Sequence, residues 1–372
     1  MKKLIIHPGF HKTGTTSLQQ ALASSRESLM KEGFYYPKIG GGAQHRAAWA
    51  VIEKTWGWKS KGGRKTSFAE WGDLEKKIRK SKNTVLLSSE FFSEASQKQL
   101  DKLKNNLDGF ESKVVFTWRP LPFLLASSYQ QYLKYGIKAS YEEWLHSIFD
   151  TPRQSKITPS FWKRNLHGEV IEKWSNAFGH ENVSIISVDE KNPTFLFDSF
   201  AALAGIPAHL LQLPEQTEVN RSLSAAETAL LLQINLNYPK DAHWDSYEVF
   251  IRKGNMRALS SSTMLDPNDE KLMTPKWALD KAIEINNQNV IDIKKLGIKT
   301  IGNLNRDDFQ SIPTGTNSQI DKISIVTAAH AMIGVDLSLL NEVHGKDIAK
   351  EFYARVKKVV RLWLQLMELL RM

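Results

Sequence analysis

The sequence contains no cysteine among its 372 residues. Disulfide bonds and cysteine-ligated metal centres are therefore excluded, and a reducing compartment is compatible with the composition. No apolar run approaches the roughly 20 residues that a membrane-spanning helix needs. At the N-terminus, Lys2 and Lys3 precede only a short apolar run, 4–6, which is too short for the core of a signal peptide. We therefore expect a cytoplasmic protein.

What is present is an ordinary globular composition, with 41% hydrophobic and 24% charged residues. The length allows one large domain or two smaller ones. The net charge of +10 favours anionic partners such as nucleotides, acidic glycans or a membrane face. A basic enzyme with no macromolecular partner fits the same charge equally well.

Short apolar runs alternate with helical patterns over residues 1–207. The runs predict four buried strands, at 4–6, 84–89, 113–118 and 182–188. Strands that alternate with helices indicate a parallel sheet covered by helices on both faces. We therefore expect an α/β fold.

The first predicted strand leads through a glycine-bearing loop into a helix predicted over 17–30. Such a loop presents backbone N–H groups and a helix N-terminus to a phosphate. Gly9 and Gly14, followed by two threonines, have the spacing of a nucleotide-binding P-loop, but the lysine is Lys12 rather than the residue after Gly14. Without a lysine there, the loop suits one phosphate better than a triphosphate. Glycine and threonine also occur in ordinary strand-to-helix turns.

Polar residues follow two further predicted strands. Glu90 comes directly after the strand 84–89, and Arg119 comes after the strand 113–118. The carboxyl ends of parallel strands are where open α/β sheets bind ligands. An arginine fork together with a hydroxyl, here Ser127, suits a phosphate monoester. Both residues also fit a structural role.

These residues bring a family into view. The segment 12–17 resembles the 5′-phosphosulfate loop of sulfotransferases that use 3′-phosphoadenosine 5′-phosphosulfate (PAPS). Arg119 with Ser127 is similar to the 3′-phosphate motif of that family, and the segments 183–207 and 220–224 look like family segments as well. These blocks span most of the chain before residue 300. The resemblance implies a P-loop-type parallel sheet flanked by helices.

The resemblance also implies roles for the site residues. Backbone N–H groups of 13–17 would hold the 5′-phosphate, Lys12 would stabilise the leaving oxygen, and Arg119 with Ser127 would bind the 3′-phosphate. The full set of implied cofactor-binding residues is His11, Lys12, Thr13, Gly14, Thr15, Thr16, Ser17, Arg119, Ser127, Arg252, Lys253 and Gly254, of which the last three resemble a second 3′-phosphate motif. The product would be adenosine 3′,5′-bisphosphate, and no metal is implied.

Sulfuryl transfer also needs a base that takes the acceptor's proton. Glu90 is the base implied by position, and burial would raise its pKa above the ordinary value of about 4.3. His45, which follows a triple glycine at 40–42, and His11 are the histidine alternatives.

The implied acceptor is a hydroxyl of a carbohydrate, glycolipid or surface polysaccharide, and we expect no nucleic-acid partner. Two other functions fit parts of the sequence. A P-loop kinase or NTPase would use the glycine-bearing loop. A non-catalytic module for anionic glycan or nucleic acid would use the basic, tryptophan-containing tract 54–82.

The predicted domain organisation is an α/β domain over 1–305, a linker over 306–318 and a helical extension over 319–372. The segment 351–372 has an apolar face with lysines and arginine elsewhere. This helix could dock on the main domain, pair with a second copy in a homodimer, or lie on the inner face of a membrane.

Overall fold

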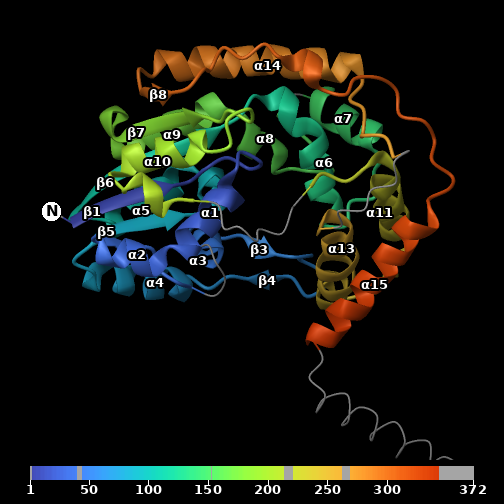
Figure 1. Ribbon diagram of the computed structural model, residues 1–372, viewed down its shortest axis with the longest axis horizontal. Coiled ribbons are helices and arrows are strands. Elements are labelled where there is room, and N and C mark those ends of the chain that lie inside the picture. Colours follow the sequence, from blue (N-terminus) through green and yellow to red (C-terminus); the bar gives the residue numbers. More distant parts are fainter. Residues whose placement is uncertain (1, 40–43, 152, 213–220, 262–268, 343–372) are drawn as a thin grey trace, which may run out of the picture.

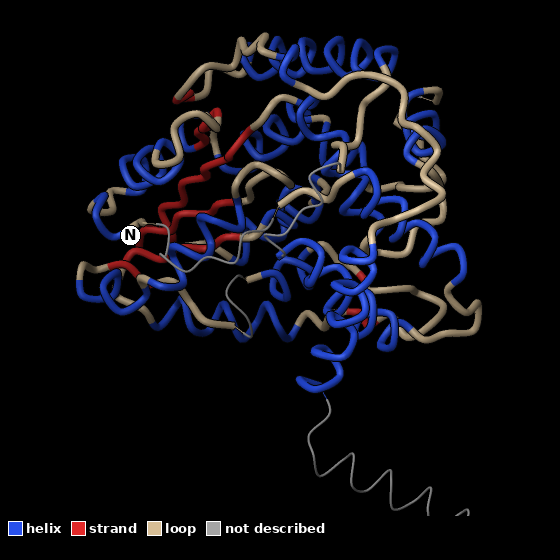
Figure 2. Tube along the Cα trace, turned by 45° about the vertical axis from the view of Figure 1, so that its right-hand side comes forward, coloured by secondary structure: helices blue, strands red, loops and turns tan. Residues whose placement is uncertain are grey.

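The computed structural model describes residues 2–39, 44–151, 153–212, 221–261 and 269–342. Its centre is a six-stranded parallel sheet (Figures 1 and 2), which confirms the predicted α/β fold. The strands, in their spatial order, are β2 (Phe34–Tyr35), β5 (Thr84–Ser88), β1 (Lys2–His7), β6 (Phe110–Trp118), β7 (Val183–Ser187) and β8 (Lys299–Ile301).

The strand order reverses at β1. This strand pairs with β5 on one side, through Ile6 and Leu87, and with β6 on the other, through Ile6 and Val114. The chain passes from β5 across β1 to β6. The loops that follow β5 and β1 therefore leave the sheet in different directions at the carboxyl ends of these strands. A reversal of this kind opens a crevice in which α/β sheets bind ligands.

Helices cover both faces of the sheet because its side chains alternate. Leu4 and Ile6 are buried in one cluster, and Ile5 is buried in another. The first cluster includes α3 (His45–Val51), α4 (Ala69–Lys80), α5 (Gln97–Asn106) and α9 (His167–Phe178). The second includes α1 (Thr15–Ser24), α2 (Arg26–Lys31) and α10 (Phe195–Ala204).

A mainly helical part lies beside the sheet, on the right in Figure 1. Its core is rich in aromatic side chains such as Trp144, Trp244 and Tyr247. The hairpin of β3 (Thr55–Trp56) and β4 (Arg64–Lys65) contacts it. The helices of this part are α6 (Leu125–Leu133), α7 (Tyr141–Phe149), α8 (Phe161–Asn165), α11 (Ala225–Asn237), α12 (Trp244–Tyr247), the π-helix η5 (Glu248–Asn255), α13 (Met256–Ser261) and α15 (Ile325–Glu342). The helix α14 (Lys276–Lys295) joins both parts, with Ala278 and Ala282 in the aromatic-rich core and Val290 and Ile293 in the first sheet cluster, beside α9.

Several elements differ from the prediction. The helix expected over 17–30 starts at Thr15 and is interrupted at Ser25, so that it forms two helices, α1 and α2. The Ser25 hydroxyl donates a hydrogen bond to the Leu210 carbonyl at 2.5 Å, outside the helix. The strand β8 was not predicted, because its residues are mostly exposed and form no apolar run.

The segments after 305 are tied to the main body. Arg306 pairs with Glu190 and Asp308, and Asn317 exchanges hydrogen bonds with the backbone of Met273. The helix α15 packs on η5, where Ser338 donates to the Val249 carbonyl at 2.7 Å. The division into 1–305, 306–318 and 319–372 stays a prediction, and the helix expected over 351–372 lies outside the described residues.

Short 3₁₀ turns connect many of these elements: η1 (Glu90–Glu94), η2 (Leu121–Leu124), η3 (His180–Asn182), η4 (Ala208–Leu210) and η6 (Phe309–Ser311). In the part of the chain that the structure describes, every helix is too short or too polar to cross a bilayer. The cellular location stays a prediction.

Candidate active site

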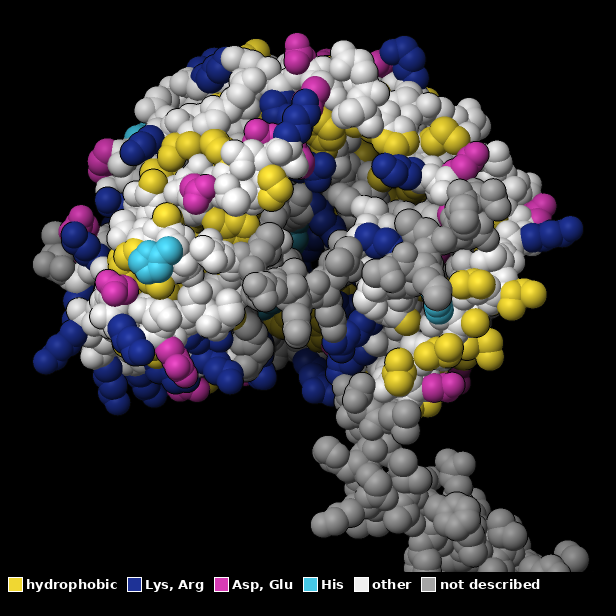
Figure 3. Space-filling model, in the orientation of Figure 1, with side chains coloured by type: hydrophobic (Ala, Val, Ile, Leu, Met, Phe, Trp, Pro, Cys, Tyr) yellow, Lys and Arg dark blue, Asp and Glu magenta, His cyan; other side chains and the backbone are white. Residues whose placement is uncertain are grey.

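A cavity of about 710 Å³ lies at the carboxyl ends of β1, β5 and β6. Figure 3 shows the molecule hollowed at its centre, with lysine and arginine side chains inside the hollow. Most of the predicted site residues line this cavity, namely His11, Lys12, Gly14, Thr15, Thr16, Ser17, His45, Glu90, Arg119, Ser127 and Arg252.

Three predicted site residues do not line the cavity. Thr13 is buried beneath the loop. Lys253 is exposed, and Gly254 is buried under α15, where a Cβ would come within 3.1 Å of the Cα of Val335. The tripeptide 252–254 therefore brings only its arginine to the site.

The loop after β1 has an unusual backbone. Gly9, Lys12 and Gly14 have φ values of 54°, 67° and 80°, in the left-handed region. Glycine adopts this region freely, but a lysine there is strained. A Cβ at Gly9 would lie 2.5 Å from the Cγ2 of Thr15, so the loop packs tightly on the helix that follows. Strain of this kind persists only where the surrounding structure enforces it.

A buried hydrogen-bond chain supports the loop from below. The Thr13 hydroxyl donates to the Phe10 carbonyl at 2.7 Å and lies 2.7 Å from the hydroxyl of Thr117. His7 lies between two strands: its Nε2 is 3.2 Å from the hydroxyl of Thr117, and its Nδ1 is 2.8 Å from the hydroxyl of Ser88. Burial lowers the pKa of His7 to about 4, so the ring is neutral at pH 7. The chain thus ties the loop to β1, β5 and β6.

The N-terminus of α1 is open toward the cavity. Gly14 occupies the capping position, where it has no side chain to accept hydrogen bonds from the first N–H groups. The first turn also contains no acidic residue. The first N–H groups of a helix have no partner within the helix, and they favour an anion together with the helix dipole. The hydroxyls of Thr16 and Ser17 belong to this turn and line the cavity. This end of the cavity therefore fits a phosphate group.

The surroundings of Lys12 perturb its ammonium group. Its Nζ donates to Oε1 of Gln131 at 3.0 Å. Burial, together with the nearby Lys134 and Arg164, lowers the pKa of Lys12 to about 7, although Glu90 opposes this shift. A bound anion would favour the protonated ammonium.

Glu90 and His45 lie next to each other. An Oε2 atom of Glu90 accepts a hydrogen bond from Nε2 of Gln19 at 3.1 Å, and Nδ1 of His45 is 3.7 Å away. His45 Nδ1 also lies 2.8 Å from the hydroxyl of Ser89. Burial acts to raise the pKa of Glu90, but His45, His11 and the hydrogen bonds outweigh burial and lower it. The expectation of a raised pKa was therefore wrong, and the carboxylate is ionised at neutral pH.

A second glutamate, one turn further along η1, was not identified from the sequence. Glu94 is buried and accepts from His11 Nε2 at 3.2 Å, Lys54 Nζ at 2.9 Å and Arg164 Nη2 at 2.9 Å. Burial acts to raise its pKa, but Arg164, His11 and Lys54 hold that pKa far below its usual range. Burial, followed by Arg164, lowers the pKa of His11 to about 4. In the sequence, only its spacing from Glu90 pointed to Glu94 as a residue of this site.

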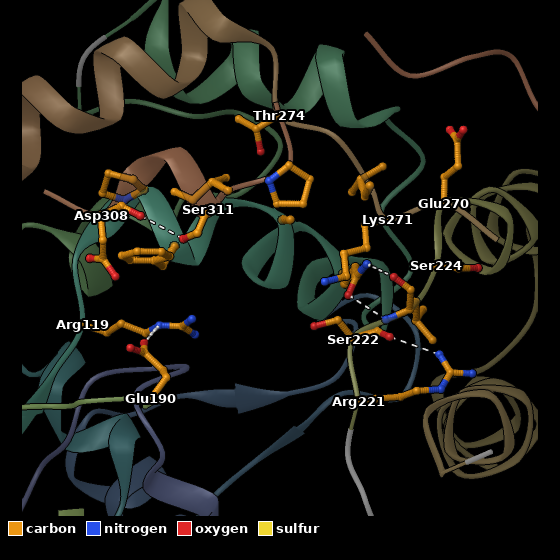
Figure 4. Close-up of a pocket in the computed structure, with 18 of the residues that line it drawn as sticks. Arg119, Glu190, Arg221, Ser222, Ser224, Glu270, Lys271, Thr274, Asp308 and Ser311 are labelled. Atoms are coloured by element: carbon orange, nitrogen blue, oxygen red, sulfur yellow. Dashed lines mark hydrogen bonds and ion pairs between the residues drawn. The ribbon is translucent and has the colours of Figure 1, made fainter. Parts of the chain in front are cut away.

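Arg119 lies where this cavity meets a second one of about 640 Å³, shown in Figure 4. It forms an ion pair with Glu190, which follows β7, and its guanidinium carbon lies 5.2 Å from the ring centroid of Phe123. Ser127 donates its hydroxyl hydrogen to the Leu124 carbonyl at 3.1 Å. Both predicted 3′-phosphate residues thus line the cavity of about 710 Å³, and of the two only Arg119 also lines the second cavity.

The described residues contain no cluster of three or more histidines, aspartates or glutamates arranged for a metal ion. No family model and no curated protein matches the sequence. Among solved structures, the chain is similar to a sulfotransferase from Alicyclobacillus acidocaldarius, with 13% identity and a TM-score of 0.45 over 80% of this chain and 95% of that chain.

Proposed function

We propose that this protein is a sulfotransferase that moves the sulfuryl group of PAPS to a hydroxyl of a carbohydrate, glycolipid or surface polysaccharide. The observation that carries the proposal is the strained loop 9–14, which leads into the open N-terminus of α1 and has Lys12 and the ionised Glu90 in the same cavity. Phosphate binding, a cation for the leaving oxygen and a base for the acceptor are the three requirements of the reaction.

The residues present fit the cofactor. The N–H groups at the start of α1, with the hydroxyls of Thr16 and Ser17, suit its 5′-phosphate. Arg119 and Ser127, which both line the cavity of about 710 Å³, suit its 3′-phosphate. When bound, PAPS supplies a sulfuryl group on a phosphate leaving group. A cavity of about 710 Å³ lies within the usual size range of small-molecule sites.

The chain's own residues would act by position and charge. Lys12 would donate a hydrogen bond to the leaving oxygen, where negative charge develops. Glu90 would accept the proton of the acceptor hydroxyl, since its lowered pKa keeps it ionised. His45, at 3.7 Å from Glu90, would orient that carboxylate or act as the base itself.

Thermal denaturation with three ligands tests this function against the two alternatives. Adenosine 3′,5′-bisphosphate should raise the melting temperature most, because it is the ligand that the proposed site should bind most tightly. A ligand at 100 times its Kd stabilises the folded state by about 2.7 kcal/mol. A larger shift with ATP and Mg²⁺ would favour a kinase or NTPase, and a shift with heparin alone would favour a binding module. Transfer of radiolabelled sulfate from PAPS to fractionated cell extract then tests catalysis and identifies the acceptor fraction.

A further inference from the structure

Lys134 has no assigned task in cofactor binding, and Arg252 has one only through its resemblance to a second 3′-phosphate motif. Lys134 follows α6 and Arg252 lies in η5, and both side chains line the cavity that holds Lys12 and Glu90. Lys134 and Arg252 are far apart in the sequence, so only the fold brings them to one wall.

Arg252 is held rigidly by aromatic rings. Its guanidinium carbon lies 4.3 Å from the ring centroid of Trp56 and 4.8 Å from that of Tyr135. Its nearest carboxylate is Glu248 at 3.6 Å, and Glu248 also accepts a hydrogen bond from Trp56 Nε1 at 3.2 Å. The Nε atom of Arg252 is buried and has no hydrogen-bond partner in the structure. Such a guanidinium is preorganised and incompletely hydrogen-bonded.

Lys134 increases the imbalance of charge on this wall. Within the described ranges, its ammonium group has neither an acidic partner nor a hydrogen bond. Burial, followed by the charge of Arg252, lowers the pKa of Lys134. Lys134 and Arg252 are half-buried cations that repel each other, and Glu248 pairs with Arg252, so Lys134 in particular favours the binding of an anion.

Other residues suit the two phosphates of the cofactor. Lys12 and the start of α1 serve the 5′-phosphate, and the charges that act on Arg119 are Glu190, Arg306 and Asp308. The charge that lowers the pKa of Lys134 is Arg252, and Lys134 in turn helps to lower the pKa of Lys12. Positive charge therefore continues along the wall from Lys12 through Lys134 to Arg252, which lies beside the aromatic rings of Trp56 and Tyr135.

We propose that Lys134 and Arg252 form an anion subsite for the acceptor, so that the acceptor is a saccharide carrying a carboxylate or sulfate group beside its reactive hydroxyl. This inference rests on the proposed function and names its substrate class. It also assigns Arg252 to the acceptor rather than to the 3′-phosphate of the cofactor.

Isothermal titration with three matched oligosaccharides tests the subsite: a neutral dextran hexasaccharide and its carboxymethylated and sulfated derivatives. At least one anionic derivative should bind about tenfold or more tightly than the neutral one, and the tighter of the two identifies the anion. Arg252→Gln and Lys134→Gln should each weaken that binding about tenfold. Arg252→Lys should retain part of the binding, because it keeps the charge.

Lys98→Gln is the matched control, since Lys98 is an exposed lysine on α5 away from the cavity. An equal loss in this control, or equal binding of the neutral and anionic oligosaccharides, would overturn the inference. So would a loss of adenosine 3′,5′-bisphosphate affinity in Arg252→Gln as large as the loss of oligosaccharide affinity. If the wild-type protein does not bind adenosine 3′,5′-bisphosphate, the proposed function is wrong. Oligosaccharide titrations without nucleotide still test the subsite in that case.

Discussion

Lys12, in the loop 9–14, combines a strained backbone with a perturbed ammonium group. If it stabilises the leaving oxygen, Lys12→Ala should lower kcat about 10²-fold or more and should change the affinity for adenosine 3′,5′-bisphosphate much less. Steady-state kinetics and calorimetry measure the two quantities. The exposed Lys98→Ala serves as the control, and normal turnover of Lys12→Ala would refute the role.

The pH dependence of the same residue has a definite sign. Only the protonated ammonium donates a hydrogen bond, and the pKa of Lys12 is lowered to about 7 in the free protein. The value of kcat/KM should therefore fall as the pH rises through about 7, because kcat/KM reports the free enzyme. A bound anion raises this pKa, so the limb in kcat should lie at higher pH.

Arg119 should affect binding rather than turnover. The 3′-phosphate does not react, so Arg119→Ala should weaken adenosine 3′,5′-bisphosphate by a few kcal/mol, as expected for a charge-assisted bond. Calorimetry of the folded variant measures the change. Arg153→Ala, which removes an exposed arginine paired with Glu169, is the control. Unchanged affinity in Arg119→Ala would contradict the assignment.

The base is decided by a comparison of two neighbours. We expect Glu90→Gln to lose most of its single-turnover rate at saturating cofactor, because an amide cannot accept the proton as a carboxylate does. His45→Ala should retain more of the rate, because it removes only a side chain that orients Glu90. The opposite order would assign the base to His45.

A glutamate base also predicts a pH profile. The pKa of Glu90 is lowered from the ordinary glutamate value of about 4.3. Glu90 should therefore stay ionised between about pH 5 and neutrality, and kcat/KM should show no acid limb from it in that range. A limb near neutrality that disappears in a histidine variant would contradict the assignment to Glu90.

The turn η1 carries two glutamates with different tasks. Glu90 faces the cavity, while Glu94 holds Lys54, Arg164 and His11. Replacing Glu94 with Gln leaves buried cations without their carboxylate, which should lower the free energy of unfolding by about 3–5 kcal/mol. Urea denaturation measures this loss. Glu75→Gln, which breaks the helix-surface pair with Arg79, should cost less than about 1 kcal/mol.

The loop 9–14 and α1 act as one element. The left-handed conformations of Gly9 and Gly14 allow the loop to pack on the helix, and the chain of His7, Thr117 and Thr13 holds it to the sheet. The loop is therefore preorganised by contacts to three strands before any ligand binds.

The whole molecule should lose stability on mild acidification. Burial lowers the pKa of His7 to about 4 and that of His167 to about 3, whereas an unfolded histidine has a pKa of about 6.5. Below pH 6.5 the unfolded chain binds protons first. The free energy of unfolding should then fall by about 1.4 kcal/mol per pH unit for each histidine.

Urea titrations at several pH values between 7.5 and 4.5 measure this slope. It should be smaller in His167→Gln, which removes one of the three buried histidines with a lowered pKa, His7, His11 and His167. A free energy of unfolding that stays constant from pH 6.5 to 4.5 would contradict the prediction. Below the ordinary glutamate pKa, the lowered pKa of Glu94 should add a further loss of stability as the pH falls.

Much of the fold was readable from local pattern. The four predicted strands correspond to β1, β5, β6 and β7, because each is a short apolar run buried on both faces. The residues that follow three of them, Lys12, Glu90 and Arg119, line one cavity because the carboxyl ends of parallel strands meet at one edge of the sheet. Apolar spacing and glycine position report the local backbone, so the sequence was sufficient for these features.

Only the tertiary structure decided which distant side chains meet. The partners of Glu94 come from residues 11, 54 and 164, and Lys134 meets Arg252 across more than a hundred positions of the chain. The direction of the Glu90 pKa shift likewise depended on His45, Gln19 and His11 rather than on burial alone. Charge–charge interactions and desolvation depend on separation in space, and no periodicity along the chain encodes that separation.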